Sequence, residues 1–180
     1  MRLFIALPLP ERTKDNLQRT AEQLRHFAAE GNFVPKQNYH VTLHFLGEVA
    51  DDDIIYVQAA MDELKDFPAM TLALSRLAVL RPSNVVCVKF RPDKQLDVLH
   101  EKLGSELEKR GFTVEHRAFR PHVSVIRKGV FTLPFSETSK NATVYNMPFE
   151  CDKISLFKSD LCSEGAVYTE LYSVDLAKID

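Results

Sequence analysis

The chain carries one short pattern twice, as His40-Val41-Thr42-Leu43 and, 82 residues later, as His122-Val123-Ser124-Val125. Both copies lie in apolar runs of the kind that form β-strands. Side chains two positions apart on a strand project from the same face, so each copy presents an imidazole and a hydroxyl together, while the valine between them faces a core. A fold that brings the two copies together would create a site with two imidazoles, one able to accept a proton while the other donates one.

The repeat extends beyond the two motifs. With the same offset, the apolar run 3–6 falls on the run 85–88, and each run is followed by a proline and an amphipathic segment. Gly47 after the first motif falls on Gly129 after the second. The identities are few, but the order of strand, helix, connection and histidine-bearing strand is that of an internal duplication. We expect two lobes related by a pseudo-twofold axis, with the motif strands in separate sheets that face one central groove.

Hydrophobic periodicity predicts an α+β chain. We expect helices at residues 11–29, from about 53 to 64 and at 93–110, and strands at residues 3–7, 39–46, 70–78, 85–90, 119–127, 151–158 and 167–174. The aspartates at 51–53 are expected to cap the second helix, and residues 128–146 to form a polar connection. Because strands and helices do not alternate strictly, we predict two mainly antiparallel sheets flanked by helices. Residues 1–180 are expected to form a single bilobal domain of two interleaved lobes, each with one motif.

The composition restricts the class of partner. The chain has 180 residues, 45% of them hydrophobic, which is enough for a buried core. Its formal net charge is -2, so it lacks the overall positive field of a protein that grips long nucleic acids, and an anionic partner should be small or held locally. One basic cluster surrounds the second motif and comprises His116, Arg117, Arg120, His122, Arg127 and Lys128. Such a cluster often only solvates a strand edge, but around a candidate catalytic histidine it favours an anionic substrate.

Other features predict a cytoplasmic protein. The apolar run near the start of the chain is too short to span a bilayer and lacks the flanks of a signal peptide, so no membrane association is expected. Cys87, Cys151 and Cys162 form an odd set without CxxC spacing, which argues against disulfides and against a thiolate zinc site. We expect a monomer without an obligatory protein partner.

The other histidines are not expected to bind a metal. His40 and His44 are four residues apart, and on a strand that rises about 3.3 Å per residue their side chains are separated by roughly 13 Å, too far for a shared ion. No metal and no cofactor are therefore expected. His44 should lie toward solvent or at a pocket rim, and His26, His100 and His116 should be ordinary surface or helix residues.

Two imidazoles and two hydroxyls are suited to an in-line displacement at phosphorus. A neutral imidazole can take a proton from attacking water, an imidazolium can protonate the departing sugar oxygen, and the hydroxyls can hold the phosphoryl oxygens. Histidine has an unperturbed pKa of about 6.5, so it can fill either role near neutrality without a metal.

The two motifs resemble the paired HxTx motifs of the two-histidine phosphoesterase superfamily. They are most similar to its bacterial and archaeal branch, the RNA 2′,3′-cyclic phosphodiesterases historically named 2′-5′ RNA ligases. The resemblance rests on residues 38–48, Asn-Tyr-His-Val-Thr-Leu-His-Phe-Leu-Gly-Glu, and residues 120–127, Arg-Pro-His-Val-Ser-Val-Ile-Arg. It extends to residues 2–7 and 154–159 and to Tyr168, so it covers nearly the whole chain.

This resemblance implies metal-independent hydrolysis of RNA or nucleotide 2′,3′-cyclic phosphate ends to 2′-phosphates, with RNA ends or small cyclic nucleotides as substrates. His40 would be the proton donor and His122 the proton acceptor. Thr42 and Ser124 would bind the phosphoryl group. Arg127 matches an arginine that the family places near the phosphate. It lies five residues after His122, however, and an ideal strand would point it to the opposite face unless a strand end or a bulge redirects it.

Two other functions are compatible with the same residues. One is a 2′-5′ oligonucleotide phosphodiesterase or ligase, since ligation is the reverse of the same displacement with a 5′ hydroxyl in place of water. The other is a module that binds RNA ends without turnover, which would leave the paired imidazoles and hydroxyls unexplained.

Overall fold

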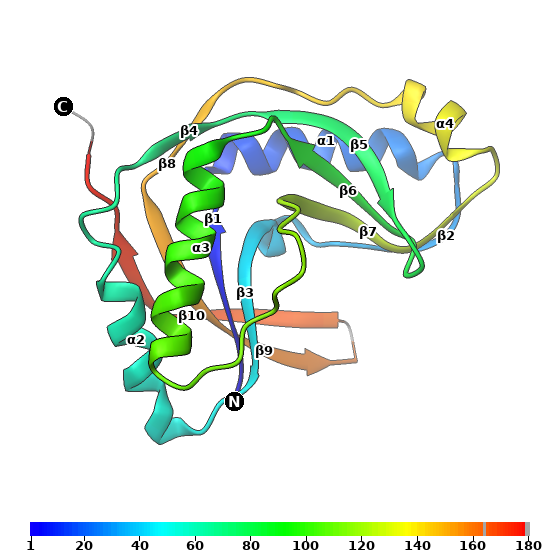
Figure 1. Cartoon of the computed structure of the whole chain (residues 1–180). Helices are drawn as coiled ribbons and strands as arrows, with labels where there is room; N and C mark the ends of the chain where they lie inside the picture. The colour runs from blue at the N-terminus through cyan, green and yellow to red at the C-terminus, as the bar shows by residue number, and fades with distance from the viewer. Residues whose placement is uncertain (164, 179–180) are drawn as a thin grey trace.

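Two four-stranded sheets make up most of the structure, a computed structural model that describes residues 1–163 and 165–178. Sheet A has the strand order β10-β9-β1-β3, formed by Gly165–Asp175, Lys153–Cys162, Arg2–Pro8 and His40–Glu48 (Figure 1). Sheet B has the order β2-β7-β6-β5, formed by Ala28–Phe33, His122–Phe131, Val85–Phe90 and Leu74–Leu80. A two-stranded sheet pairs β4 (Met70–Leu72) with β8 (Phe149–Cys151). The strands pair antiparallel. The predicted α+β class and the placement of the motif strands in separate sheets are therefore confirmed.

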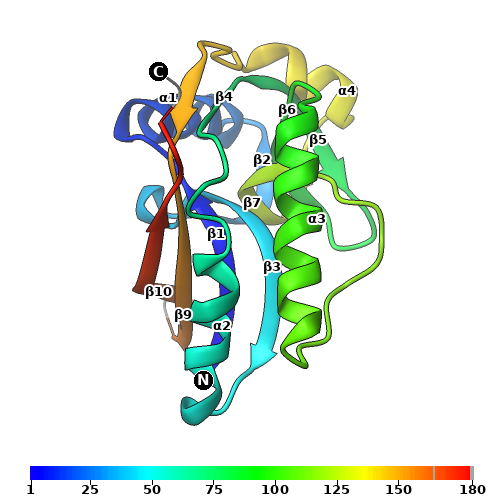
Figure 2. The ribbon, with the colours of Figure 1, turned by 60° about the vertical axis from the view of Figure 1, so that its left-hand side comes forward.

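The helices are exchanged between the two halves of the chain. They are α1 (Glu11–Arg25), α2 (Ile54–Asp62), α3 (Lys94–Lys109) and the short α4 (Phe135–Thr138), with 3-10 turns at Lys36–Asn38, Asp51–Asp53 and Ser139–Asn141. α1 follows β1 of sheet A in the chain but packs against β7 and β2 of sheet B. α3 follows β6 of sheet B but packs against β3 of sheet A, beside α2 (Figure 2). Each half therefore supplies a helix that covers the sheet of the other half.

Continuous apolar runs form the central strands of both sheets. β1 lies between β9 and β3, and β6 lies between β7 and β5. A strand that is paired on both sides and covered on both faces buries every side chain, so it shows no alternation of polar and apolar residues. Residues 3–7 and 86–88 are buried accordingly. These are the runs that the sequence assigned to strands.

The backbone pairing around the two motifs is the same in both sheets. The matching pairs are Pro8 with His40 and Ala6 with Thr42 in sheet A, and Lys89 with His122 and Cys87 with Ser124 in sheet B. β6 is therefore offset from β1 by 81 residues, whereas β7 is offset from β3 by 82. The sequence alignment, which set Ala6 on Val88, was wrong by one position, although the order of the elements was right.

Each motif strand contains a β-bulge directly after its hydroxyl residue. Leu43 on β3 has no partner on β1, and Val125 on β7 has none on β6. A bulge adds one residue to a strand and so reverses the alternation of the side chains that follow it. The residue after each bulge therefore faces the core as well. Phe45 and Arg127 then return to the face that carries the histidine and the hydroxyl, which we call the site face.

Some element boundaries differ from those expected from the sequence. The first helix ends at Arg25 rather than near residue 29, and residues 28–33 form β2, an edge strand paired with β7. The sequence of this segment, Ala-Ala-Glu-Gly-Asn-Phe, has low strand propensity. Pairing with β7 makes it a strand, and Gly31 is required there because a Cβ would lie 2.8 Å from a methyl group of Ile126.

Three further expectations need correction. The predicted strands 70–78 and 151–158 are each divided, because β4 and β8 leave the main sheets to pair with each other. The predicted connection 128–146 contains the end of β7 as well as α4. The aspartates at 51–53 form a 3-10 turn before α2 and make no capping bond with their side chains.

His44 was expected near the surface but is buried, with 4% of its surface exposed. The bulge at Leu43 turns its ring into the core, where it stacks on His100 of α3 with ring centroids 4.2 Å apart. His44 Nε2–H donates to the His100 carbonyl oxygen at 2.9 Å. Gly104 leaves room for the ring, since a Cβ there would lie 3.1 Å from His44 Cε1. His100 is a helix residue, as expected, but it is half-buried between His44 and Phe119 rather than on the surface.

The buried histidines should make the fold sensitive to acid. Burial lowers the pKa of His100 to about 4 and also lowers the pKa of His44. Below about pH 6.5, the ordinary pKa of histidine, these rings take up protons in the unfolded chain but not in the folded protein. Stability that is present above that pH is therefore lost as the pH falls toward 4. His100→Phe keeps an aromatic ring in the stack and removes one titrating group. In urea unfolding between about pH 7.5 and pH 5, the variant should lose less stability on acidification than the wild type. Equal losses would contradict this explanation.

Candidate active site

His40 is fixed by a backbone hydrogen bond at one ring nitrogen. Its Nδ1–H donates to the Asn38 carbonyl oxygen at 2.7 Å, so Nε2 carries the lone pair of the neutral ring. Nε2 accepts a hydrogen bond from the Thr42 hydroxyl at 3.0 Å. Asn38 is held in turn, because its Nδ2 donates to the Ala166 carbonyl oxygen on β10 at 2.7 Å. Both the tautomer and the orientation of the His40 ring are thereby determined.

His122 is fixed in the same way. Its Nδ1–H donates to the Arg120 carbonyl oxygen at 2.8 Å. Arg120 precedes His122 by two residues, as Asn38 precedes His40. The segment that leads into each motif strand therefore supplies the same acceptor in both halves, and each neutral imidazole presents Nε2 as its proton-accepting atom.

The fold brings the two motifs together. β3 and β7 contact each other although they belong to different sheets. His122 is near enough to His40 for its positive charge to lower the pKa of His40. Thr42 on β3 and Ser124 on β7 occupy equivalent register positions, and each lies on the site face of its own sheet. The four motif residues singled out in the sequence thus lie on neighbouring strands.

Burial is the main reason why both imidazoles resist protonation. It lowers the pKa of His40 to about 4; the bond to the Asn38 carbonyl opposes this shift, and the nearby charges of Arg127 and His122 add to it. Burial also lowers the pKa of His122, and the charges of Lys89 and Arg127 contribute in the same direction. Both rings are therefore neutral at pH 7 in the unliganded protein. An anion bound beside them would favour their protonated forms.

Aromatic rings surround His40. Phe4 of β1 lies 4.9 Å from it between ring centroids, Tyr168 of β10 meets it edge-on at 5.3 Å, and Phe157 of β9 lies at 6.4 Å. Phe45, which the bulge returns to the site face, packs on Phe4 at 5.7 Å and is 59% exposed. These rings account for the burial of His40, and Phe45 leaves exposed apolar surface beside them.

Arg127 reaches the same place from the other sheet. Its Nη2 donates to the Tyr168 hydroxyl at 3.4 Å, and the Tyr168 ring contacts His40. The bulge at Val125 makes this contact possible, because it reverses the parity of the strand between His122 and Arg127. The opposite orientation, expected for an ideal strand, is not the one observed.

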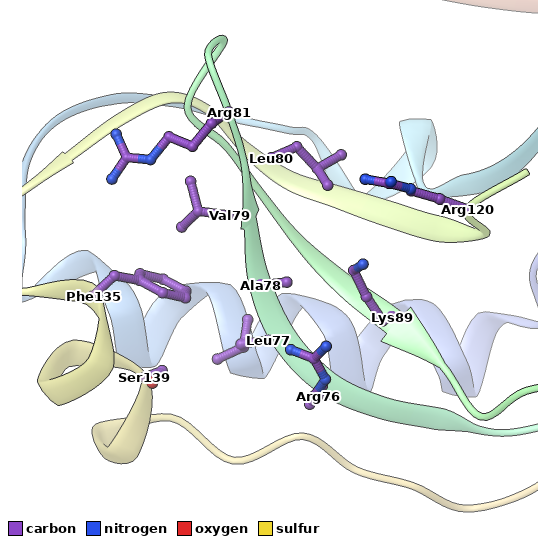
Figure 3. Close-up of a pocket in the computed structure, with 10 residues that line it drawn as sticks. All are labelled: Arg76, Leu77, Ala78, Val79, Leu80, Arg81, Lys89, Arg120, Phe135 and Ser139. Carbon is purple, nitrogen blue, oxygen red and sulfur yellow. The ribbon is translucent and has the colours of Figure 1, made fainter. Parts of the chain in front are cut away.

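Among the described residues, positive charge rather than aromatic rings surrounds His122. Lys89 pairs with His122 in the register of β6 and β7. Lys89 and Arg120 also line a cavity of about 630 Å³ that follows β5 (Figure 3). Arg76 and Arg81 line the same cavity. This cavity adjoins the motif residues without enclosing them. The two halves therefore place similar imidazoles in different surroundings.

Sequence reasoning missed most of these surroundings. Lys89 is the only charged residue in the apolar run 85–90, and that exception could have identified it. Phe45 could not be assigned to the site, because alternation from His40 places it on the opposite face unless the bulge is known. His26 and His116 are exposed, as expected, and His44 and His100 lie in the core cluster behind β3.

Within residues 1–163 and 165–178, no group of three or more His, Cys, Asp or Glu side chains could hold a metal ion. No helix among the same residues is long and apolar enough to cross a membrane. Cys87, Cys151 and Cys162 are free thiols.

Comparisons with known proteins give matches along nearly the whole chain. The family model described as LigT-like phosphoesterase matches residues 7–87. The RNA 2′,3′-cyclic phosphodiesterases of Thermotoga maritima and Escherichia coli are 24% and 27% identical to the chain; these matches cover 96% and 94% of it, and 94% and 93% of the relatives. The crystal structure of E. coli LigT complexed with 3′-AMP superimposes with a TM-score of 0.82 and 26% identity, covering 97% of each chain.

NMR titration of the imidazole Cε1–H signals should reveal the effect of burial on the two motif histidines. We expect a pKa of about 4 for His40 in the unliganded protein and a pKa below the ordinary histidine value for His122. Inorganic phosphate should raise both pKa values, because a bound anion stabilises the imidazolium forms. A His40 signal that titrates near 6.5 without phosphate would contradict the burial argument. Signals are assigned by their loss in His40→Gln and His122→Gln.

Proposed function

We propose that this chain, which resembles the LigT-like phosphoesterases of the two-histidine superfamily, hydrolyses RNA or nucleotide 2′,3′-cyclic phosphate ends to 2′-phosphates. The observation that carries this proposal is the shared geometry of two imidazoles, each held by a bond from Nδ1 to the carbonyl two residues before it. That geometry offers two equivalent Nε2 atoms, one for each proton transfer. The relatives named RNA 2′,3′-cyclic phosphodiesterases support the same choice of reaction.

In the proposed reaction His122 is the general base and His40 the general acid. Neutral His122 Nε2 takes a proton from water, whose oxygen attacks phosphorus while the bond between phosphorus and the 3′ oxygen breaks. Protonated His40 gives its Nε2 proton to the departing 3′ oxygen, so the product carries a 2′-phosphate and a free 3′ hydroxyl. Imidazoles perform both transfers, and the scheme requires no metal. Proton exchange with solvent then restores the two starting states.

The substrate itself supplies the charge that this scheme needs. Burial lowers the pKa of His40 to about 4 in the unliganded protein, so the proposed acid is neutral there at pH 7. The negative charge of a cyclic phosphodiester beside the ring favours the imidazolium. Substrate binding and protonation of His40 are therefore coupled.

Thr42, Ser124 and Arg127 are proposed to hold the phosphoryl oxygens. The Thr42 hydroxyl donates to His40 Nε2 in the unliganded protein, so it must turn toward a phosphoryl oxygen when substrate binds, which releases Nε2 for the leaving group. Ser124 has the equivalent position on β7. Arg127 adds a permanent positive charge that strengthens its hydrogen bonds to a phosphate.

We extend the proposal to residues 1–180 as one bilobal domain. Each sheet carries one motif and is covered by a helix from the other half, so neither half has a complete site by itself. One copy of the chain supplies both histidines, which supports a monomer as the working form. The cytoplasm, where RNA ends are available, is the proposed location.

The purified protein should convert a nucleoside 2′,3′-cyclic phosphate to the 2′-monophosphate in the presence of EDTA, because imidazoles perform both proton transfers. Phosphorus NMR distinguishes the 2′- from the 3′-monophosphate. A 3′-monophosphate product would reverse the assignment of the leaving oxygen. Activity lost on chelation and restored by zinc or manganese would overturn the metal-free mechanism. Tight binding without turnover would favour the RNA-end-binding alternative, and faster cleavage of a linear 2′-5′ linkage would favour the oligonucleotide phosphodiesterase.

Alanine at His40 or at His122 should each lower kcat by roughly 10²–10⁴-fold, the usual contribution of a positioned proton-transfer group. The two residues act as a unit, so the double variant should lose much less than the product of the two single losses. Wild-type activity should follow a bell-shaped pH profile. The pH profile of kcat should lie at higher pH than the profile of kcat/KM, because bound phosphate raises the pKa values of His40 and His122. His26→Ala, an exposed histidine, is the matched control. Full activity in either folded single variant would refute the two-histidine mechanism.

A further inference from the structure

A row of positive charge runs from His122 across sheet B. Lys89 on β6 pairs with His122 on β7. On β5, Leu77 pairs with Val88 and Leu74 with Phe90, so Ser75 and Arg76 lie opposite Lys89. Adjacent strands are about 4.8 Å apart, which places Arg76 about 10 Å from His122 at the level of the backbone.

Strand register and alternation place Lys89 and Arg76 on the site face, in the row next to the buried thiol of Cys87. Cys87 pairs with Ser124 on β7 and with Ala78 on β5, so it lies in the row next to the cations. Burial raises the pKa of Cys87 to about 11, and the nearby charges of Lys89 and Arg76 partly oppose that rise. Both cations are therefore close to the same point on the site face.

Arg76, Lys89 and Arg120 border one cavity of about 630 Å³ that follows β5. Its described lining includes no carboxylate. Figure 3 shows Lys89 and Arg120 on one side of β5, with Phe135 and Ser139 on the other. The cavity is thus open, wide and positively charged where it adjoins His122.

The charges of Arg76, Lys89 and Arg120 are not paired with carboxylates in the part of the chain that the structure describes. Some cations elsewhere on the surface pair with a carboxylate, as Lys36 does with Asp15 and Arg110 with Glu106. Arg76 and Arg120 are exposed. Three unpaired cations around a concave surface repel one another, and a bound polyanion would relieve that repulsion.

We propose that the cavity lined by Arg76, Lys89 and Arg120 is a subsite for internal phosphodiester groups of an RNA chain whose end reacts at His40 and His122. The inference rests on the proposed function and makes it more specific, since the preferred substrate becomes an oligonucleotide rather than a mononucleotide. The subsite begins beside His122 and extends about 10 Å to β5, a distance that the backbone of a chain covers within a few nucleotides of the reacting end. Arginine and lysine contacts with phosphates are independent of base sequence, so this subsite recognises chain length.

The test is a series of RNA substrates of one, two, four and six nucleotides, each ending in a 2′,3′-cyclic phosphate. For the wild type at low salt, kcat/KM should rise with length to about tenfold above the mononucleotide value and then level off, as expected for a few exposed ion pairs. The advantage should shrink as salt increases, because phosphate contacts release counterions.

Arg76→Gln and the charge reversal Arg76→Glu locate the subsite, because Arg76 is exposed and touches none of the motif residues. The advantage of the hexanucleotide over the mononucleotide should fall about 2- to 5-fold in the first variant and further in the second. The slope of log kcat/KM against log salt should become shallower by about 0.7 in Arg76→Gln, the value for one phosphate contact on a single strand. Hydrolysis of the mononucleotide should stay at the wild-type rate in both. Lys102→Gln, which removes one charge from the exposed face of α3, is the control and should leave the length advantage unchanged.

The possible failures are distinguishable. Mononucleotide hydrolysis without any length dependence would overturn the subsite and leave the proposed function intact. A length dependence that survives Arg76→Glu would place the chain elsewhere and also overturn it. If no cyclic phosphate is hydrolysed, the proposed function fails. Fluorescence anisotropy with a labelled hexaribonucleotide then tests the subsite alone, and equal affinity of wild type and Arg76→Glu would reject it.

Discussion

An unpaired residue in each motif strand determines what the two halves present to the site. The bulges at Leu43 and Val125 let the histidine and hydroxyl face one side while the next two residues both enter the core. They also return Phe45 and Arg127 to the site face. A regular strand would instead have pointed His44 toward the site and Arg127 away from it. The packing of the core and the composition of the site therefore depend on the same irregularity of the backbone.

The same backbone geometry carries different chemistry in the two halves. Both motif histidines bond through Nδ1 to a carbonyl two residues upstream, so their rings are held alike. Around His40, however, the neighbours are Phe4, Tyr168 and other rings, whereas around His122 they are cations such as Lys89. A pseudosymmetric frame thus holds two imidazoles in equivalent ways. The unequal surroundings place apolar surface beside one imidazole and positive charge beside the other.

The exchange of helices makes the site a property of the whole chain. α1 leaves sheet A to cover sheet B, and α3 leaves sheet B to cover sheet A, where the stack of His100 on His44 holds it against β3. Contacts between residues far apart in sequence therefore stabilise both motif strands. Arg127 adds a direct link between the sheets through Tyr168. Each sheet is thus covered by a helix of the other half, so the core and the site draw on the whole chain.

The sequence by itself determined the fold class, the central strands and the three main helices, because buried runs are local patterns. It also showed that the motif of His40 and Thr42 has a counterpart in His122 and Ser124, because a repeated motif can be read directly from the chain. It did not reveal β2, whose residues become a strand only by pairing with β7. It placed His44 at the surface, and ideal alternation along the strand pointed Arg127 away from the site face. Neither bulge could be foreseen, since a bulge is set by how two strands pair and not by the residues of one. The charged row from His122 through Lys89 to Arg76 crosses three strands. Only the tertiary structure could assemble it, because its members are brought together by sheet register rather than by spacing along the chain.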